Sequence, residues 1–144
     1  MSCQVFESAM NPDGFKGDFP SEVMPDGVES STRIVFYILP EFTSVVGAYL
    51  LIIPNATGNL RWSATTTFGE VCNNEDYDTH TDSVAGTTTG VTIDKITCLD
   101  ISAALTGLAI GDLVGLQFIR CGDDVLDTIG DSVHFIGVLL TICE

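Results

Sequence analysis

Basic residues are scarce in this chain of 144 residues. It has 5 Lys and Arg against 20 Asp and Glu, which gives a formal net charge of −15. The few basic residues are scattered along the sequence, so they predict no basic patch, and a surface of this sign repels phosphate groups. We therefore expect no direct binding to DNA or RNA. The acidity itself has two interpretations: it keeps the surface soluble, or some carboxylates hold Ca²⁺ or another hard cation.

Long apolar segments are also lacking. The longest apolar region, residues 45–53, contains Gly47 and stops at Pro54, whereas about 20 apolar residues are needed to cross a bilayer as a helix. We expect no membrane span. The first seven residues contain neither the basic nor the apolar region of a secretory signal, so no signal peptide is visible.

Motifs for structural zinc and for catalysis are missing as well. There is no Cys-x-x-Cys pair, nucleophile elbow, metalloprotease helix, Walker loop or dinucleotide fingerprint. The only histidines are His80, in an acidic loop, and His134, in an apolar run, and neither context is typical of a catalytic base. We expect no enzyme activity.

The cysteines are odd in number and widely spaced. Reduced, mostly buried thiols are the favoured interpretation. One or two disulfides, or a bond through Cys3 to a neighbouring subunit, are the alternative in an oxidising place. The five positions are Cys3, Cys72, Cys98, Cys121 and Cys143.

Short apolar and β-branched runs are abundant, and hydrophobic residues make up 45% of the chain. One helical turn is predicted at residues 100–105, with Asp100 to cap the start and Gly107 to end it. Strands at antiparallel spacing with one short helix predict an all-β fold, an antiparallel β-sandwich of jelly-roll type. The predicted strands are residues 33–39, 45–53, 60–68, 91–97, 113–121 and 133–143.

The first part of the chain has a different pattern. Residues 1–31 carry three turn signals and no sustained period, which predicts an extended N-terminal arm ahead of a jelly-roll domain of residues 32–144. Phe6, Phe15 and Phe19 are isolated aromatics that could anchor this arm as assembly contacts. Docking on a neighbouring subunit and docking on the arm's own domain both remain open.

The closing run, residues 133–143, is apolar on both alternating faces, so we expect this strand to be covered on both sides. The set with Ile136, Val138, Leu140 and Ile142 is the more uniformly aliphatic and is predicted to face the core. Leu139, on the other face, is a predicted assembly contact.

Two loops are crowded with acidic residues, at 73–83 and 122–131. Ligand sets made only of oxygen suit Ca²⁺ better than a transition metal, although neither loop has the spacing of an EF-hand. No cofactor is expected to be required, and calcium is the candidate ion. Its candidate ligands are Asp76, Asp78, Asp82, Asp123, Asp124 and Asp127.

Residues 36–142 resemble small jelly-roll structural domains of phages and environmental viruses. The resemblance implies a module on a virion surface: a capsid decoration protein, head fibre or tail appendage. Its partners would be copies of itself and a major capsid or tail protein. The likeness lies in the order of Tyr37-Ile38-Leu39-Pro40, Ala48-Tyr49-Leu50-Leu51-Ile52, the loop around Tyr77, Asp100-Ile101-Ser102, the run from Leu108 to Leu116, Arg120 with Asp123-Asp124, Asp127-Thr128, and the run from Val133 to Val138.

Two other functions fit the residues. A subunit of an extracellular tube or filament would use the arm to complete a neighbour's sheet by strand addition. A carbohydrate-binding module would need exposed aromatics on one sheet face, and Trp62 is the only tryptophan. A virion surface or an extracellular assembly is therefore the expected location.

Overall fold

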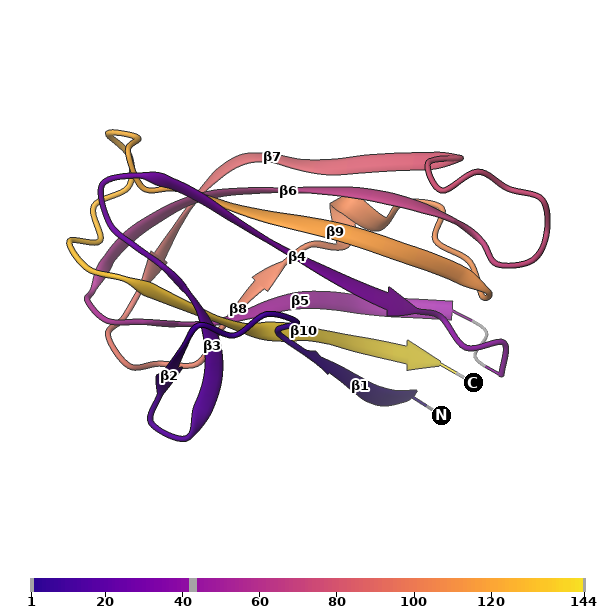
Figure 1. Cartoon of the computed structure of the whole chain (residues 1–144), viewed down its shortest axis with the longest axis horizontal. Coiled ribbons are helices and arrows are strands. Elements are labelled where there is room, and N and C mark those ends of the chain that lie inside the picture. The colour runs from indigo at the N-terminus through magenta and orange to yellow at the C-terminus, as the bar shows by residue number, and fades with distance from the viewer. Residues whose placement is uncertain (1, 42–43, 144) are drawn as a thin grey trace.

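Strands make up most of the chain, and they lie in two antiparallel sheets that pack face to face (Figure 1). The computed structural model describes residues 2–41 and 44–143. We name the sheets after their inner strands. The β10 sheet contains β1 (Ser2–Ser8), β2 (Gly14–Lys16), β3 (Phe19–Met24), β5 (Ser44–Pro54), β8 (Thr97–Asp100) and β10 (Val133–Cys143). The β9 sheet contains β4 (Glu29–Tyr37), β6 (Gly58–Glu70), β7 (His80–Val91) and β9 (Asp112–Cys121).

Strand pairing is nested along the chain. Strand β3 pairs with β10, β4 with β9, β5 with β8, and β6 with β7, all antiparallel. The chain from β3 to β10 is therefore one long hairpin with β6 and β7 at its tip, and its successive pairs alternate between the two sheets. A hairpin rolled up in this way is an eight-stranded jelly roll. The predicted all-β, jelly-roll sandwich is confirmed.

The core lies between the sheets and is built by strict alternation. In β4, for example, Ile34 and Phe36 are buried whereas Arg33 and Val35 are exposed, because successive side chains of a strand point to opposite faces. Aromatic rings fill the centre of the core. The ring centroid of Phe118 lies 6.1 Å from that of Trp62 and 5.6 Å from that of Phe135, so the only tryptophan is a core residue.

Strand β10 changes face at its middle. Its pairing with β5 shifts register between Phe135 and Gly137, which leaves Ile136 as the extra residue of a β-bulge. Val133 and Phe135 therefore face the core before the bulge, and Val138, Leu140 and Ile142 are buried after it. The predicted inward set was right for those last three residues and wrong for Ile136.

The N-terminal segment is part of the β10 sheet of its own chain. Strand β1 pairs with the second half of β10, and β3 pairs with its start, so Met24 reaches the core. The structure thus differs from the expected division, because the boundary at residues 31 and 32 falls inside β4. Strand β1 lies so close to Gly137 that a Cβ there would clash with the Glu7 carbonyl and lie 2.8 Å from the Phe6 ring.

Two local predictions need adjustment. The predicted strand at 91–97 is the connection between β7 and β8, which end and begin at those two residues. The predicted helical turn is the 3₁₀ helix η1 (Ser102–Leu105). The Asp100 carboxylate holds its start by accepting hydrogen bonds from the backbone N–H and the hydroxyl of Ser102. Within the described ranges, no helix has the length and apolar character that a membrane crossing would require.

Candidate assembly surface

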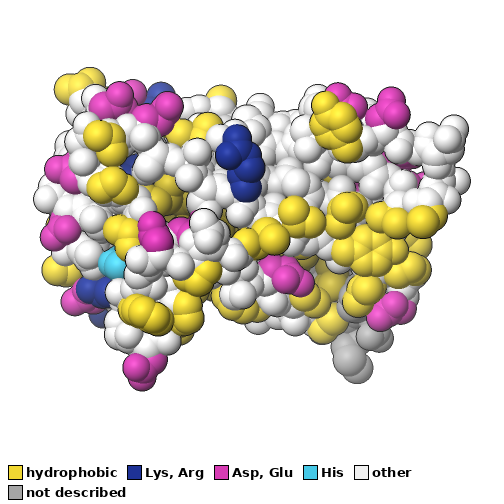
Figure 2. Space-filling model, viewed as in Figure 1, with side chains coloured by type: hydrophobic (Ala, Val, Ile, Leu, Met, Phe, Trp, Pro, Cys, Tyr) yellow, Lys and Arg dark blue, Asp and Glu magenta, His cyan; other side chains and the backbone are white. Residues whose placement is uncertain are grey.

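The outer face of the β10 sheet is apolar because β5 and β10 carry apolar residues at both alternating positions. Phe6 of β1 pairs with Leu139 of β10, which pairs in turn with Tyr49 of β5. The next row contains Gly137 and Leu51. Figure 2 views the molecule from the edge where the two sheets meet, and there hydrophobic side chains gather over the ends of β4, of the β9 sheet, and of β10. Contiguous exposed apolar surface of this kind marks interaction sites on soluble domains.

A groove of about 370 Å³ runs over this outer face, and the described residues that line it are all uncharged. We call it the outer groove. Among its large hydrophobic side chains, Phe6 and Phe19 are each 47% exposed, and Ile96 is 59% exposed. Leu51, Ile53 and Ile136 are also in the lining. The groove is therefore an apolar surface without a cover in the described part of the chain.

The structure brings three of the four predicted assembly contacts to this region or its edge. Phe6 and Phe19 line the outer groove, and Phe15 stands beside it, because its register partner Pro20 is in the lining. Phe15 is 72% exposed. Leu139 is half-buried in the neighbouring row. Their role in assembly stays a prediction.

The outer groove also contains residues that were not predicted as assembly contacts: Leu51 and Ile53 of β5, and Ile96 of the loop before β8. Leu51 and Ile53 alternate with Leu50 and Ile52, which are in the core. A strand that is apolar at every position predicts two covered faces, and that signal was present in the sequence. The position of Ile96 had no such signal, because it depends on how β8 pairs with β5.

The acidic loop at 122–131 folds around the side chain of Arg120 and accepts hydrogen bonds from it. The Arg120 side chain is fully buried, and its Nη2 lies 3.0 Å from Oδ1 of Asp127, whose side chain is also fully buried. Its five N–H groups make five hydrogen bonds: two to the Asp127 carboxylate and three to the carbonyls of Met24, Ile129 and Asp131. One guanidinium therefore ties the end of β3 and this loop to β9.

The other candidate calcium ligands do not converge. Asp82 accepts backbone N–H bonds from Ser83 and Thr106, which lower the pKa of its carboxyl. Asp124 accepts the N–H of Leu126, and Asp76, Asp78 and Asp123 are exposed. Across residues 2–41 and 44–143, no three His, Cys, Asp or Glu side chains come together as ligands of one ion. Calcium binding stays a prediction.

The two histidines lie apart in the structure. His80 stacks on Phe68, with ring centroids 5.2 Å apart. His134 is buried, with Nδ1 2.7 Å from the Ser21 hydroxyl and Nε2 3.1 Å from the Asn55 amide nitrogen. Asn55 accepts from Lys16 through its oxygen, so its NH₂ group donates to Nε2, and the His134 proton lies on Nδ1. Ser21 then accepts from the ring and is fully buried, an arrangement that stabilises the fold and does not activate a nucleophile.

Protonation of His134 should destabilise the fold. Burial, and then the positive charge of Lys16, hold the pKa of His134 below the usual 6.5, while Asp13 and Asp131 act in the opposite direction. The unfolded chain therefore binds more protons than the folded chain as the pH falls through 6.5, so the free energy of unfolding falls with it. We expect a lower melting temperature at about pH 5.5 than at about pH 7.5, and a smaller difference in the variant His134→Gln. An equal difference in melting temperature in both proteins would show that protonation of His134 is not its cause.

The cysteines differ from the favoured interpretation in their burial. Cys3, Cys72, Cys98 and Cys121 are free thiols. None of the five is buried: Cys72 and Cys98 are exposed, and Cys3, Cys121 and Cys143 are half-buried. The expectation of mostly buried thiols was wrong, because strand alternation turns Cys98 away from the core and β1 is an edge strand.

No protein-family model and no curated protein sequence matches this chain. Among solved structures, the VP2 subviral particle of infectious bursal disease virus aligns over 99% of this chain at 16% identity and a TM-score of 0.45. This chain spans only 33% of that chain. The coat protein of tobacco streak virus aligns over 99% of this chain and 86% of its own length, at 12% identity and a TM-score of 0.39. The jelly-roll assignment rests on the strand order of this chain itself.

Proposed function

We propose that this protein is a non-enzymatic structural subunit of a virion surface, and that copies of it join through the outer groove. The observation that carries the proposal is an uncharged, apolar groove on a chain with a net charge of −15. Covering Phe6, Phe19 and Ile96 would remove apolar area from water, which is favourable by about 25 cal/mol per Å².

Charge favours a second copy as the occupant. Two copies of so acidic a chain repel each other, and salt screens this repulsion beyond about 8 Å under physiological conditions. Contact is then least costly where neither copy presents a carboxylate. The outer groove meets this condition because no charged residue lines it within residues 2–41 and 44–143.

The virion location is inferred from the resemblance in sequence, whereas self-association is inferred from the outer groove. Jelly rolls occur in viral capsid domains, in lectins and in cupins, so the topology does not decide between them. The resemblance of residues 36–142 to phage and environmental-virus domains favours the virion. A decoration, head-fibre or tail role, with a major capsid or tail protein as a further partner, belongs to the same proposal.

The substitution Ile96→Asp tests the proposal. Ile96 is exposed in the single chain, so the change should leave the fold intact while placing a charge in the outer groove. An unpaired charge buried at an interface is unfavourable by several kcal/mol, so we expect self-association to weaken at least about tenfold. Size-exclusion chromatography with light scattering measures the oligomeric state.

Val125→Asp is the matched control. Val125 is 89% exposed and lies in the loop at 122–131, away from the lining of the outer groove. We expect this variant to assemble as the unmodified protein does. Equal assembly of all three proteins, or a monomeric unmodified protein, would contradict assembly through the groove. Electron microscopy of the assembled protein then separates a shell or knob from a tube.

A further inference from the structure

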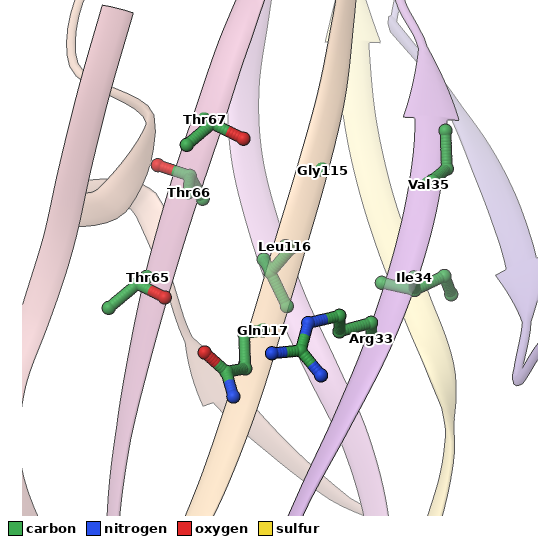
Figure 3. Close-up of a pocket in the computed structure, with 9 residues that line it drawn as sticks. All are labelled: Arg33, Ile34, Val35, Thr65, Thr66, Thr67, Gly115, Leu116 and Gln117. Atoms are coloured by element: carbon green, nitrogen blue, oxygen red, sulfur yellow. The ribbon is translucent and has the colours of Figure 1, made fainter. Parts of the chain in front are cut away.

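The outer face of the β9 sheet, on the other side of the sandwich from the outer groove, carries a second kind of surface. Arg33 of β4 pairs with Gln117 of β9, which pairs with Thr65 of β6. In the next row, Val35, Gly115 and Thr67 pair in the same order. Figure 3 shows the Arg33 guanidinium directed across the sheet toward Gln117. This face therefore presents hydroxyl, amide and guanidinium groups together.

A hollow lies in the middle of this face because Gly115 has no side chain. It has a volume of about 230 Å³, and Arg33, Thr65, Thr67 and Gln117 are in its lining. A second hollow of about 480 Å³ shares Val35, Thr67 and Gly115 with the first and extends to Tyr77. We call the two together the outer trough. Tyr77, 80% exposed, stands at the far end from Arg33.

Arg33 forms no ion pair with any carboxylate of the described residues. Lys16, Arg61 and Arg120 each have a carboxylate within 4.0 Å, whereas Arg33 and Lys95 have none among the described residues. An unpaired guanidinium is unusual on a chain with 20 acidic residues. Its planar fork of donors matches the two oxygens of a carboxylate.

We infer that the outer trough binds an acidic saccharide, with the sugar carboxylate on Arg33 and a neutral sugar unit near Tyr77. The hydroxyls of Thr65 and Thr67 and the amide of Gln117 match sugar hydroxyls as donors and acceptors. The exposed Tyr77 ring offers an apolar face to a pyranose ring. Glu70, Glu75 and Asp76 border the Tyr77 end, so a second acidic sugar is disfavoured there.

A peptide fits the outer trough less well. Strand β9 is paired on both sides, with β4 and with β6, so its backbone groups are already bonded and offer no edge for strand addition. The overall charge of −15 repels a polyanion such as nucleic acid, with one charge per phosphate, far more than a saccharide with a single carboxylate. A saccharide needs only the side-chain groups that this face presents.

The experiment uses the full chain and an oligosaccharide that ends in glucuronic acid, with its glucose-ended counterpart as the neutral probe. Isothermal titration should show binding of the acidic probe and at least about tenfold weaker binding of the neutral one, because a charge-assisted pair is lost. Arg33→Gln should weaken binding of the acidic probe to the same degree. Lys95→Gln, which removes the other unpaired cation, should leave it unchanged.

Gly115→Val tests the shape of the trough without changing charge. A Cβ at Gly115 would lie 3.5 Å from the Thr67 hydroxyl oxygen, which is ordinary contact, so the variant should fold with an unchanged or higher melting temperature. We expect it to lose binding of the acidic probe. Equal binding of the two probes, a loss in Lys95→Gln as large as in Arg33→Gln, full binding by Gly115→Val, or no binding by the unmodified protein would each overturn the inference. None of these variants lies in the outer groove, so the oligomeric state reports on self-assembly separately.

Discussion

Replacing Arg120 with alanine should lower the free energy of unfolding by about 3 to 5 kcal/mol, because it leaves a buried carboxylate without its partner. The side chain of Asp127 has no solvent access, so its carboxylate would lose its charge partner without gaining contact with water. The carbonyls of Met24, Ile129 and Asp131 would also lose their donors. Natural domains have a margin of only about 5 to 15 kcal/mol. Urea unfolding followed by circular dichroism measures the change.

Arg120→Lys separates geometry from charge. A lysine keeps the positive charge but has three donors in place of five, so it cannot satisfy Asp127 and all three carbonyls. We expect this variant to be destabilised as well, though less than Arg120→Ala. Lys95→Ala removes an exposed cation and should change stability by less than about 0.5 kcal/mol. A similarly small change for Arg120→Ala would show that the hydrogen bonds of Arg120 contribute little to the free energy of unfolding.

Replacing Val138 with aspartate should prevent folding of the monomer. Val138 is fully buried in the core after the bulge, opposite Leu50 of β5. An unpaired carboxylate at this position is unfavourable by several kcal/mol, which takes most of the stability of a domain of this size. Circular dichroism should show loss of the β-sheet spectrum.

Leu139→Asp, one residue later, is the matched comparison. Leu139 lies on the outer face and is half-buried, so this variant should remain folded. As a predicted assembly contact, it should also weaken self-association, which size-exclusion chromatography measures. Unfolding of both variants would contradict the assignment of faces, and normal assembly of Leu139→Asp would remove this residue from the assembly surface.

Parts of both candidate surfaces were visible in the sequence. The isolated phenylalanines of residues 1–31 indicated contact surface, and Phe6 and Phe19 do line the outer groove. Arg33 gave no signal, since an arginine at the start of a predicted strand is common. Its significance depends on Gly115 and Thr65, which come from two other strands and meet it only through sheet pairing.

The acidic loop at 122–131 shows the limit of composition. Its aspartates were interpreted as candidate calcium ligands because oxygen-rich loops suit Ca²⁺. In the structure, Asp127 is paired with Arg120, which the sequence places on the preceding strand, seven positions earlier. A count of acidic residues cannot show that the guanidinium of Arg120 on β9 points toward the loop and pairs with one of its aspartates.

The amino-acid sequence is enough to predict the class of fold, because alternation of apolar and polar residues is a local property of each strand. It also determined that β5 and β10 need cover on both faces, since they are apolar at consecutive positions. Which segments cover these faces depends on how distant parts of the chain pair. The nested pairing placed residues 2–24 on the chain's own sheet, and the bulge at Ile136 moved that side chain to the outer face. Both outcomes depend on contacts between segments far apart in sequence, whose free energies no local pattern contains.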